Sequence, residues 1–132
     1  MSAERYLIDT TIWVRYFGGE KSVEDRVKSL ILQDKILTTG IIILETLRGA
    51  RSQREYNQLY NDYKALPLLP LDSTAWEESY KTGFLLRKAG VVVPLADILI
   101  SALAICHGCQ LLHRDKHFTL IAKYTKLKEE QI

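Results

Sequence analysis

The sequence has no apolar run long enough to cross a membrane. Its longest nearly uncharged stretch covers residues 91–106 and includes Asp97, whereas a transmembrane helix needs about 20 apolar residues. The N-terminal stretch MSAERYLIDTT also lacks the positive segment and apolar segment of a secretion signal. We therefore expect no membrane segment, and we expect residues 91–106 to form a buried helix.

Cysteine is scarce, with only Cys106 and Cys109 in the chain. This scarcity and the missing export signal favour a reducing, cytoplasmic setting. A zinc site that adds His113 and His117 to the two thiols is disfavoured, because three residues separate Cys109 from His113 where a zinc finger has about a dozen. A c-type haem site is excluded since Gln110, and not histidine, follows Cys109.

The chain also lacks a large excess of charge of one sign. Its 18 basic and 16 acidic side chains give a net charge of +2, which neither requires nor excludes a nucleic-acid partner. With 132 residues, of which 47% are hydrophobic, the chain is long enough to bury a core. Because it contains no repeat, low-complexity segment or linker, we expect one domain over residues 1–132.

Short apolar segments alternate with longer segments of helical spacing. The short segments predict strands at residues 6–8, 36–38, 68–71 and 111–113, with a further edge strand in the tail at 123–132. The longer ones predict helices from about residue 10, at 23–33, 40–50, 53–66, 72–90, 94–108 and 116–122. This alternation indicates an α/β fold with a parallel sheet covered on both faces.

Three acidic side chains have apolar neighbours. Asp9 follows Leu-Ile, Glu45 follows Ile-Ile-Ile-Leu, and Asp97 is the only charge within residues 91–106. Each has a simple structural explanation taken singly. Asp9 is a suitable helix N-cap, Glu45 is spaced to pair with Arg48, and Asp97 falls in a first helical turn where the helix dipole favours an anion.

The predicted topology gives these acids a common location. In a parallel α/β sheet, strands end and the following helices begin at the carboxyl edge. Asp9 ends the first strand, and Glu45 is about a turn and a half into the helix after the second. The helix of Asp97 begins at the same edge if it packs antiparallel to the strand that follows it. Asp115 lies just past that strand, so four acids are predicted to converge.

Clustered carboxylates repel one another and raise each other's pKa. A hard divalent cation, Mg²⁺ or Mn²⁺, relieves this repulsion because it prefers oxygen ligands. Such a metal polarises a phosphate and lowers the pKa of a bound water, which indicates phosphodiester hydrolysis. Thr11, two residues after Asp9, either orients an acid or a metal-bound water or caps the helix, and both interpretations stay open.

The segments LIDTTIWVRYF, ILETLRGAR, PLADILISALAI and LLHRDKHF resemble the PIN-domain ribonucleases. Specifically, they resemble the VapC-type toxins of toxin–antitoxin systems, over nearly the full length; the first and third segments are fairly specific together. The resemblance implies a three-layer α/β/α sandwich with a mostly parallel central sheet. It also implies a Mg²⁺- or Mn²⁺-dependent endoribonuclease that cleaves structured RNA (tRNA or rRNA), and an antitoxin whose C-terminal segment blocks the acidic crevice.

Asp9, Glu45, Asp97 and Asp115 each match an acid of that family. On this resemblance, Asp9 and Asp97 hold the principal metal and Asp115 binds it directly or through water. Glu45 acts on the attacking water as a base, or it binds a second metal; one metal or two stays open. His113 departs from the family, which often has a small hydroxyl residue there. A histidine contact to metal or RNA and an orienting role are both open for it.

Basic side chains follow the acids in the sequence and are expected to contact RNA phosphates or antitoxin carboxylates. The alternative is an ordinary solvated face. The first set is Arg48, Arg51 and Arg54, and the second is Arg114, Lys116, Lys123, Lys126 and Lys128.

Tyr56, Tyr60 and Tyr63 recur at helical spacing, which predicts a homodimer interface more than a surface for stacking bases. Two other functions remain as alternatives. One is a PIN nuclease that processes RNA outside a toxin–antitoxin pair, and the other is a binding module without catalysis whose acids are helix caps.

Overall fold

The computed structural model describes residues 4–132, and its centre is a five-stranded sheet in which all neighbouring strands are parallel. The strand order is β3-β2-β1-β4-β5. The strands are β1 (Tyr6–Ile8), β2 (Ile36–Thr39), β3 (Leu68–Leu69), β4 (Gln110–His113) and β5 (Lys128–Gln131). The predicted parallel sheet is confirmed, and β5 is the edge strand expected in the tail.

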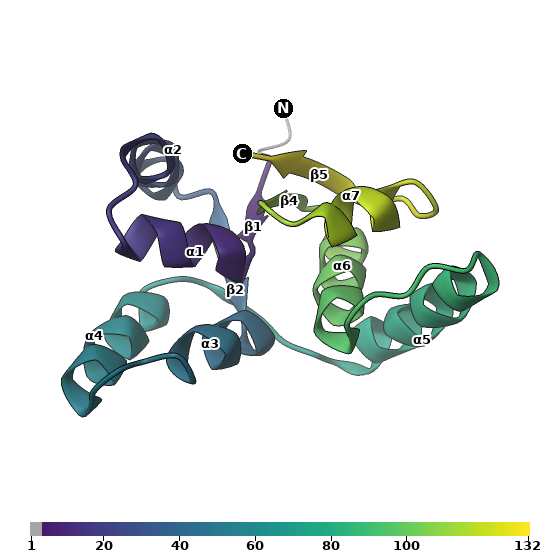
Figure 1. Cartoon of the computed structure of the whole chain (residues 1–132), viewed down its shortest axis with the longest axis horizontal. Helices are drawn as coiled ribbons and strands as arrows, with labels where there is room; N and C mark the ends of the chain where they lie inside the picture. Colours follow the sequence, from purple (N-terminus) through teal and green to yellow (C-terminus); the bar gives the residue numbers. More distant parts are fainter. Residues whose placement is uncertain (1–3) are drawn as a thin grey trace.

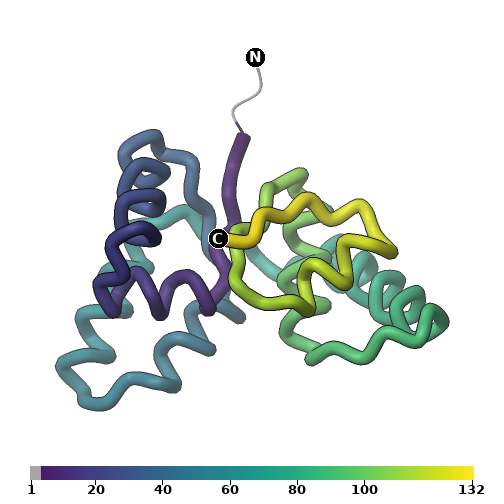
Figure 2. Tube along the Cα trace, turned by 45° about the horizontal axis from the view of Figure 1, so that its top comes forward, coloured from purple at the N-terminus to yellow at the C-terminus, as the bar shows by residue number. Residues whose placement is uncertain are grey.

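Helices cover both faces of this sheet. They are α1 (Thr10–Phe17), α2 (Lys21–Leu32), α3 (Gly40–Leu47), α4 (Gln53–Lys64), α5 (Ser73–Lys88), α6 (Leu95–His107) and α7 (Lys116–Ala122). Helices α1–α4 lie on one side of the strands and α5–α7 on the other (Figure 1). The same division persists after the molecule is turned by 45° (Figure 2). The three-layer α/β/α prediction is therefore confirmed.

The central strands are apolar because helices cover them on both faces. In β1, Leu7 and Ile8 are fully buried, and so are Leu111 and Leu112 in β4. Strand β5 has the sequence Lys-Glu-Glu-Gln, which suits an edge strand. None of the helices formed by residues 4–132 has the length and apolar character of a membrane span.

The chain reverses between α6 and β4, and this reversal places the start of α6 at the opposite end of the helix from the turn. Gly108 ends the helix in the left-handed conformation, with φ +63°, which glycine adopts without a steric penalty. The chain then reverses into β4. As a result, the first turn of α6, which carries Asp97, lies at the carboxyl edge of the sheet.

The prediction that Tyr56, Tyr60 and Tyr63 form one homodimer interface is wrong in part. Tyr63 is only 2% exposed, its ring packs edge-on against Trp13, and its hydroxyl lies 2.7 Å from Thr46 Oγ1. Tyr56 and Tyr60 are exposed and stack on each other. The three tyrosines therefore do not form one interface, because the rotation of α4 turns Tyr63 into the core.

Candidate active site

The structure brings all four acids to the carboxyl edge of the sheet. Asp9 directly follows β1, Asp115 follows β4 by two residues, Glu45 lies in α3 after β2, and Asp97 lies in the first turn of α6. Side-chain contacts connect these segments. Thr10 Oγ1 donates a hydrogen bond of 2.9 Å to Glu45 Oε1 and so links the end of β1 to α3.

Thr11, for which the sequence left two interpretations, holds Asp9 in place. The backbone N–H of Thr11 and its hydroxyl both donate to Asp9 Oδ2, at 3.1 and 2.7 Å. The same hydroxyl accepts a hydrogen bond of 3.0 Å from the backbone N–H of Arg114. Thr11 therefore orients Asp9, and Asp9 itself caps α1. Burial raises the pKa of Asp9, and the hydrogen bonds from Thr11 oppose that rise.

Asp97 is the acid with the most perturbed environment. It is 7% exposed, and its pKa is raised to about 6, first by burial and then by the Asp115 carboxylate. A hydrogen bond from His117 opposes the rise. The protein therefore holds a negative charge at neutral pH in a place that disfavours it.

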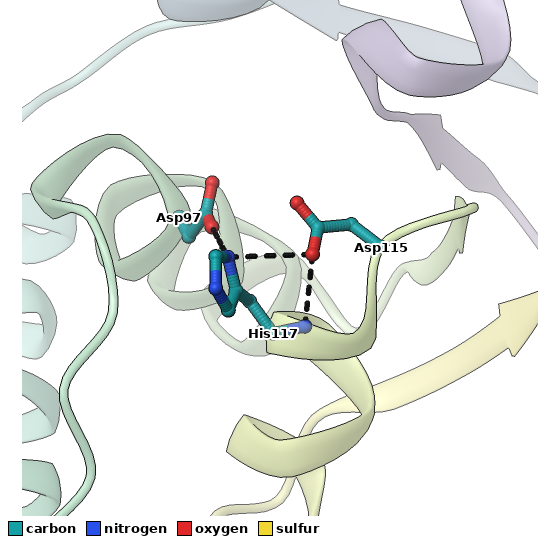
Figure 3. Close-up of side chains that lie close together, drawn as sticks. All are labelled: Asp97, Asp115 and His117. Atoms are coloured by element: carbon teal, nitrogen blue, oxygen red, sulfur yellow. Dashed lines mark hydrogen bonds and ion pairs between the residues drawn. The ribbon is translucent and has the colours of Figure 1, made fainter.

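His117 stands between two of the acids, although the sequence interpretation did not include it in the site (Figure 3). Its Nδ1 lies 3.0 Å from Asp97 Oδ2 and 3.3 Å from Asp115 Oδ1. Its backbone N–H donates to Asp115 Oδ1 at 2.9 Å, which makes Asp115 the N-cap of α7. Among residues 4–132, Asp97, Asp115 and His117 form the one group whose ligand atoms lie close enough together to hold a metal ion, within 4.8 Å of one another.

His113 has a different role from the direct contact that the sequence left open. Its side chain is fully buried, Nδ1 accepts from the backbone N–H of Asp115 at 3.1 Å, and Nε2 lies 2.8 Å from Glu129 Oε1. Because Nδ1 is an acceptor, the ring proton is on Nε2 and is donated to Glu129. Both ring nitrogens point into the protein, so His113 orients the turn of Asp115, and this arrangement argues against a direct contact to metal or RNA.

The two cysteines do not support the zinc alternative. Burial raises the pKa of both the Cys106 and the Cys109 thiols, which disfavours the thiolate that binds zinc. Within the described part of the chain, neither thiol belongs to a group that could hold a metal. His113 and His117 face Glu129 and the acids instead.

The predicted basic contacts separate into two kinds. Arg48, Arg51 and Lys116 are exposed, and Arg51 lines a cleft of about 550 Å³ together with Glu45. Arg114 instead binds both carboxylate oxygens of Glu20, at 2.8 and 3.2 Å, and the carbonyl oxygen of Ile132. Its guanidinium is occupied by structural partners, which argues against the predicted contact to RNA or antitoxin.

The acidic crevice, which consists of Asp9, Glu45, Asp97 and Asp115, fits a hard divalent cation. Asp97 and Asp115 offer carboxylate oxygens, which such ions prefer. In the described residues, both acids lie within 3.3 Å of His117 Nδ1, and neither forms an ion pair with a lysine or arginine. The raised pKa of Asp97 reports a negative charge that its surroundings do not neutralise. A bound cation would supply the missing positive charge.

Comparisons with known proteins agree with this fold. The family described as "PIN domain" matches residues 6–124. The chain is 35% identical over 130 residues to ribonuclease VapC11 of Mycobacterium tuberculosis, covering 92% of this chain and 95% of that protein. It is 28% identical over 132 residues to ribonuclease VapC21 of the same species, covering 97% and 94%.

Two solved structures have the same fold. One is VapBC2 from Rickettsia felis bound to a DNA fragment from its promoter, with a TM-score of 0.83 at 16% identity over 96% of this chain and 98% of that chain. The other is VapC20 of Mycobacterium tuberculosis, described as a toxin that cleaves the sarcin–ricin loop, with a TM-score of 0.68 at 14% identity over 93% and 98%.

Proposed function

The chain belongs to the PIN-domain family and, within it, to the VapC ribonucleases, and we propose that it is a metal-dependent endoribonuclease and the toxin of a toxin–antitoxin pair. The observation that carries this proposal is the convergence of Asp9, Glu45, Asp97 and Asp115 at one edge of the sheet. Four helix caps would not need to share an edge or to leave buried carboxylates without a lysine or arginine partner.

The ion is Mg²⁺ or Mn²⁺, held chiefly by Asp97 and Asp115 with Asp9 beside them. When bound, such an ion polarises the scissile phosphate and lowers the pKa of a coordinated water. Thr11 fixes the Asp9 carboxylate through two hydrogen bonds, and the His113–Glu129 pair fixes the turn that carries Asp115. These contacts keep the oxygen ligands in place before the ion arrives.

Glu45 is the residue to which we assign the attacking water. Thr10 holds one of its carboxylate oxygens, and its side chain lines the cleft. As the general base, Glu45 takes a proton from the water during in-line attack on the phosphate. Cleavage then leaves a 3′-hydroxyl and a 5′-phosphate.

Structured RNA, either tRNA or rRNA, is the substrate class. The sarcin–ricin loop named for the VapC20 structure is a relevant example. Exposed cations near the acids, Arg48, Arg51 and Lys116, supply phosphate contacts that position RNA without reading its sequence. An enzyme that acts on these RNAs works in the cytoplasm.

An antitoxin of the VapB type is the inhibitor. The cleft beside Glu45 and a neighbouring apolar pocket share Phe17 and Asp62, so the two hollows are adjacent along α1 and α4 and are treated as one groove in this proposal. This groove suits an amphipathic antitoxin segment with a cationic side chain that reaches the acids. A short gene for a small DNA-binding protein directly beside this one supports the pairing, whereas a solitary gene favours RNA processing.

A homodimer is the assembly we favour, through α5 and the start of α6. This surface exposes more large apolar side chains than the Tyr56–Tyr60 pair, and exposed patches of this kind mark protein contacts. The exposed apolar side chains of this surface are Trp76, Tyr80, Phe84, Val92 and Leu95. Phe84→Glu should yield a monomer in light scattering, while Tyr60→Glu should stay a dimer; the opposite result places the interface on α4.

The decisive experiment measures RNA cleavage by Asp9→Asn and Asp97→Asn. Each variant keeps the size of the side chain but removes its charge, so we expect cleavage to fall by about 100-fold or more. Asp25→Asn is the matched control because Asp25 is an exposed aspartate on α2 paired with Lys21. Undiminished cleavage by both crevice variants would rule out the assignment, and no cleavage by the native protein would favour the binding module.

A further inference from the structure

A single ring nitrogen of His117 contacts two acids of the site, Asp97 and Asp115. The first turn of α7 fixes its backbone, since its N–H donates to the Asp115 side chain. From there the ring reaches across to α6 and places Nδ1 between two carboxylate oxygens (Figure 3). The other ring nitrogen faces away from both carboxylates. The fold therefore aims one specific nitrogen at the centre of the candidate metal site.

The distances match those between neighbouring ligands of one octahedral ion. Ligand bonds of about 2.1 Å at right angles place adjacent ligand atoms roughly 3.0 Å apart. Nδ1 lies 3.0 Å from Asp97 Oδ2 and 3.3 Å from Asp115 Oδ1. Asp97 comes from α6, and Asp115 and His117 come from the N-cap and first turn of α7. Their ligand atoms all lie within 4.8 Å of one another.

We propose that His117 Nδ1 is a ligand of the catalytic cation beside Asp97 and Asp115, and that this nitrogen makes the site prefer Mn²⁺ to Mg²⁺. This inference rests on the proposed metal-dependent function and deepens it. Mg²⁺ holds oxygen ligands and its own waters strongly, whereas imidazole is a better ligand for transition-metal ions. A site made only of carboxylates would discriminate less between the two ions.

Coordination requires a change in where the ring carries its proton. Both contacts of Nδ1 are carboxylate oxygens, which accept hydrogen bonds, so Nδ1 carries the hydrogen in this structure. For Nδ1 to bind a cation, the hydrogen would have to transfer from Nδ1 to Nε2 through solvent, so that the ring stays neutral as its other tautomer. The Nδ1 lone pair then binds the ion. The cation replaces the hydrogen that now bridges the ring and the carboxylates.

The test is direct detection of nitrogen bound to Mn²⁺, by the ¹⁴N modulation of the electron spin echo from the Mn²⁺-loaded protein. Calorimetric titration with Mn²⁺ and with Mg²⁺ gives the two affinities. The proteins are the native chain, His117→Asn, His117→Ala and the matched control His107→Ala, which removes an exposed histidine at the far end of α6. Asp97→Asn reports on the metal site itself, and circular dichroism checks that each variant is folded.

We expect ¹⁴N modulation in the native protein and in His107→Ala, and its loss in both His117 variants. The Mn²⁺ affinity should fall about tenfold in His117→Asn, with a smaller change for Mg²⁺. If the native protein binds Mn²⁺ without ¹⁴N modulation, or if both ions lose affinity equally, the role of His117 is refuted while the proposed function stands. If Asp97→Asn binds both ions as the native protein does, the metal site itself is refuted.

Discussion

Acidic side chains in two regions of this molecule have opposite environments. Two outer ion pairs lie outside the acid cluster: Glu130 forms two hydrogen bonds of 2.9 Å with Arg26, and Arg114 donates to both carboxylate oxygens of Glu20. In the crevice, Asp9 receives hydrogen bonds from a threonine and Asp97 from a histidine. Arginine is used where a carboxylate holds the fold together, and it is missing from the pairs of the buried acids.

The pKa directions follow this difference. The Arg114 hydrogen bond lowers the pKa of Glu20, so its anionic form is favoured. Burial raises the pKa of Asp9 and Asp97, so their anionic forms carry a cost. Perturbed carboxylates of this kind gather at functional sites. The outer pairs therefore stabilise the protein as it stands, whereas burial, with a smaller contribution from neighbouring carboxylates, makes the charges of Asp9 and Asp97 costly in the crevice. A bound cation would reduce that cost.

Metal removal should separate the two regions most strongly. Chelation with EDTA should reduce RNA cleavage to background, and added Mn²⁺ should restore it, because the crevice needs the ion for chemistry. The circular-dichroism spectrum should not change, since the outer ion pairs and the apolar core hold the fold. Unfolding in EDTA would contradict this and would make the metal structural.

Thr11→Val should have the next largest effect. The variant keeps the shape of Thr11 but loses the hydroxyl that donates to Asp9 and accepts from the Arg114 N–H. Loss of a residue that orients a ligand typically costs 10–100-fold in activity, and we expect roughly that loss in RNA cleavage. Thr11→Ser keeps the hydroxyl and should remain near the native rate. A loss in Thr11→Ser without a loss in Thr11→Val would show that the methyl group, and not the hydroxyl, matters.

Stability should change in opposite directions in the two regions. Without metal at pH 7.5, Asp97→Asn should raise the free energy of unfolding by roughly 2 kcal/mol, because it removes a charge that the folded state disfavours. Arg26→Met should lower it by about 1 kcal/mol, since it leaves the half-buried Glu130 without its partner. Urea titrations measure both changes. A lower free energy of unfolding in Asp97→Asn would contradict the claim that the folded state disfavours the Asp97 charge.

The gain from Asp97→Asn should depend on pH. The pKa of Asp97 is about 6 in the folded chain, against an ordinary value of 3.8, so the native chain is relatively most stable below pH 4 and loses stability as pH rises through about 6. The variant lacks this loss. Its advantage should therefore be largest above pH 6 and disappear near pH 4, measured by thermal unfolding across that range.

Much of the fold could be predicted from the sequence because its elements are local and regular. Short apolar segments bounded by polar turns predicted four strands to within a few residues, and the polar edge strand β5 lies within the tail where a fifth was expected. The parallel arrangement placed the four acids at one edge. That placement needed only the order of the elements. It did not need the position of any single side chain.

The parts that the sequence did not predict depend on side-chain direction. His117 was missed because only the cap formed by Asp115 shows that the first turn of α7 points this ring toward α6. A search for histidines within one turn of the expected acids would have found it. Arg114 was expected to contact RNA because its partner Glu20 lies 94 residues away in the chain, and no local pattern connects the two.

The smallest effect should come from Glu20→Gln, which tests whether Arg114 belongs to the outer region or to the crevice. If Arg114 is structural, weakening its exposed pair should lower the melting temperature less than Arg26→Met does, and RNA affinity should not change. Arg51→Ala, which removes an exposed cation beside Glu45, should weaken RNA binding and reduce its salt dependence. Tighter RNA binding by Glu20→Gln would mean that Arg114, once released, contacts phosphate. The Glu20–Arg114 pair would then restrain a side chain that can bind RNA, in addition to stabilising the fold.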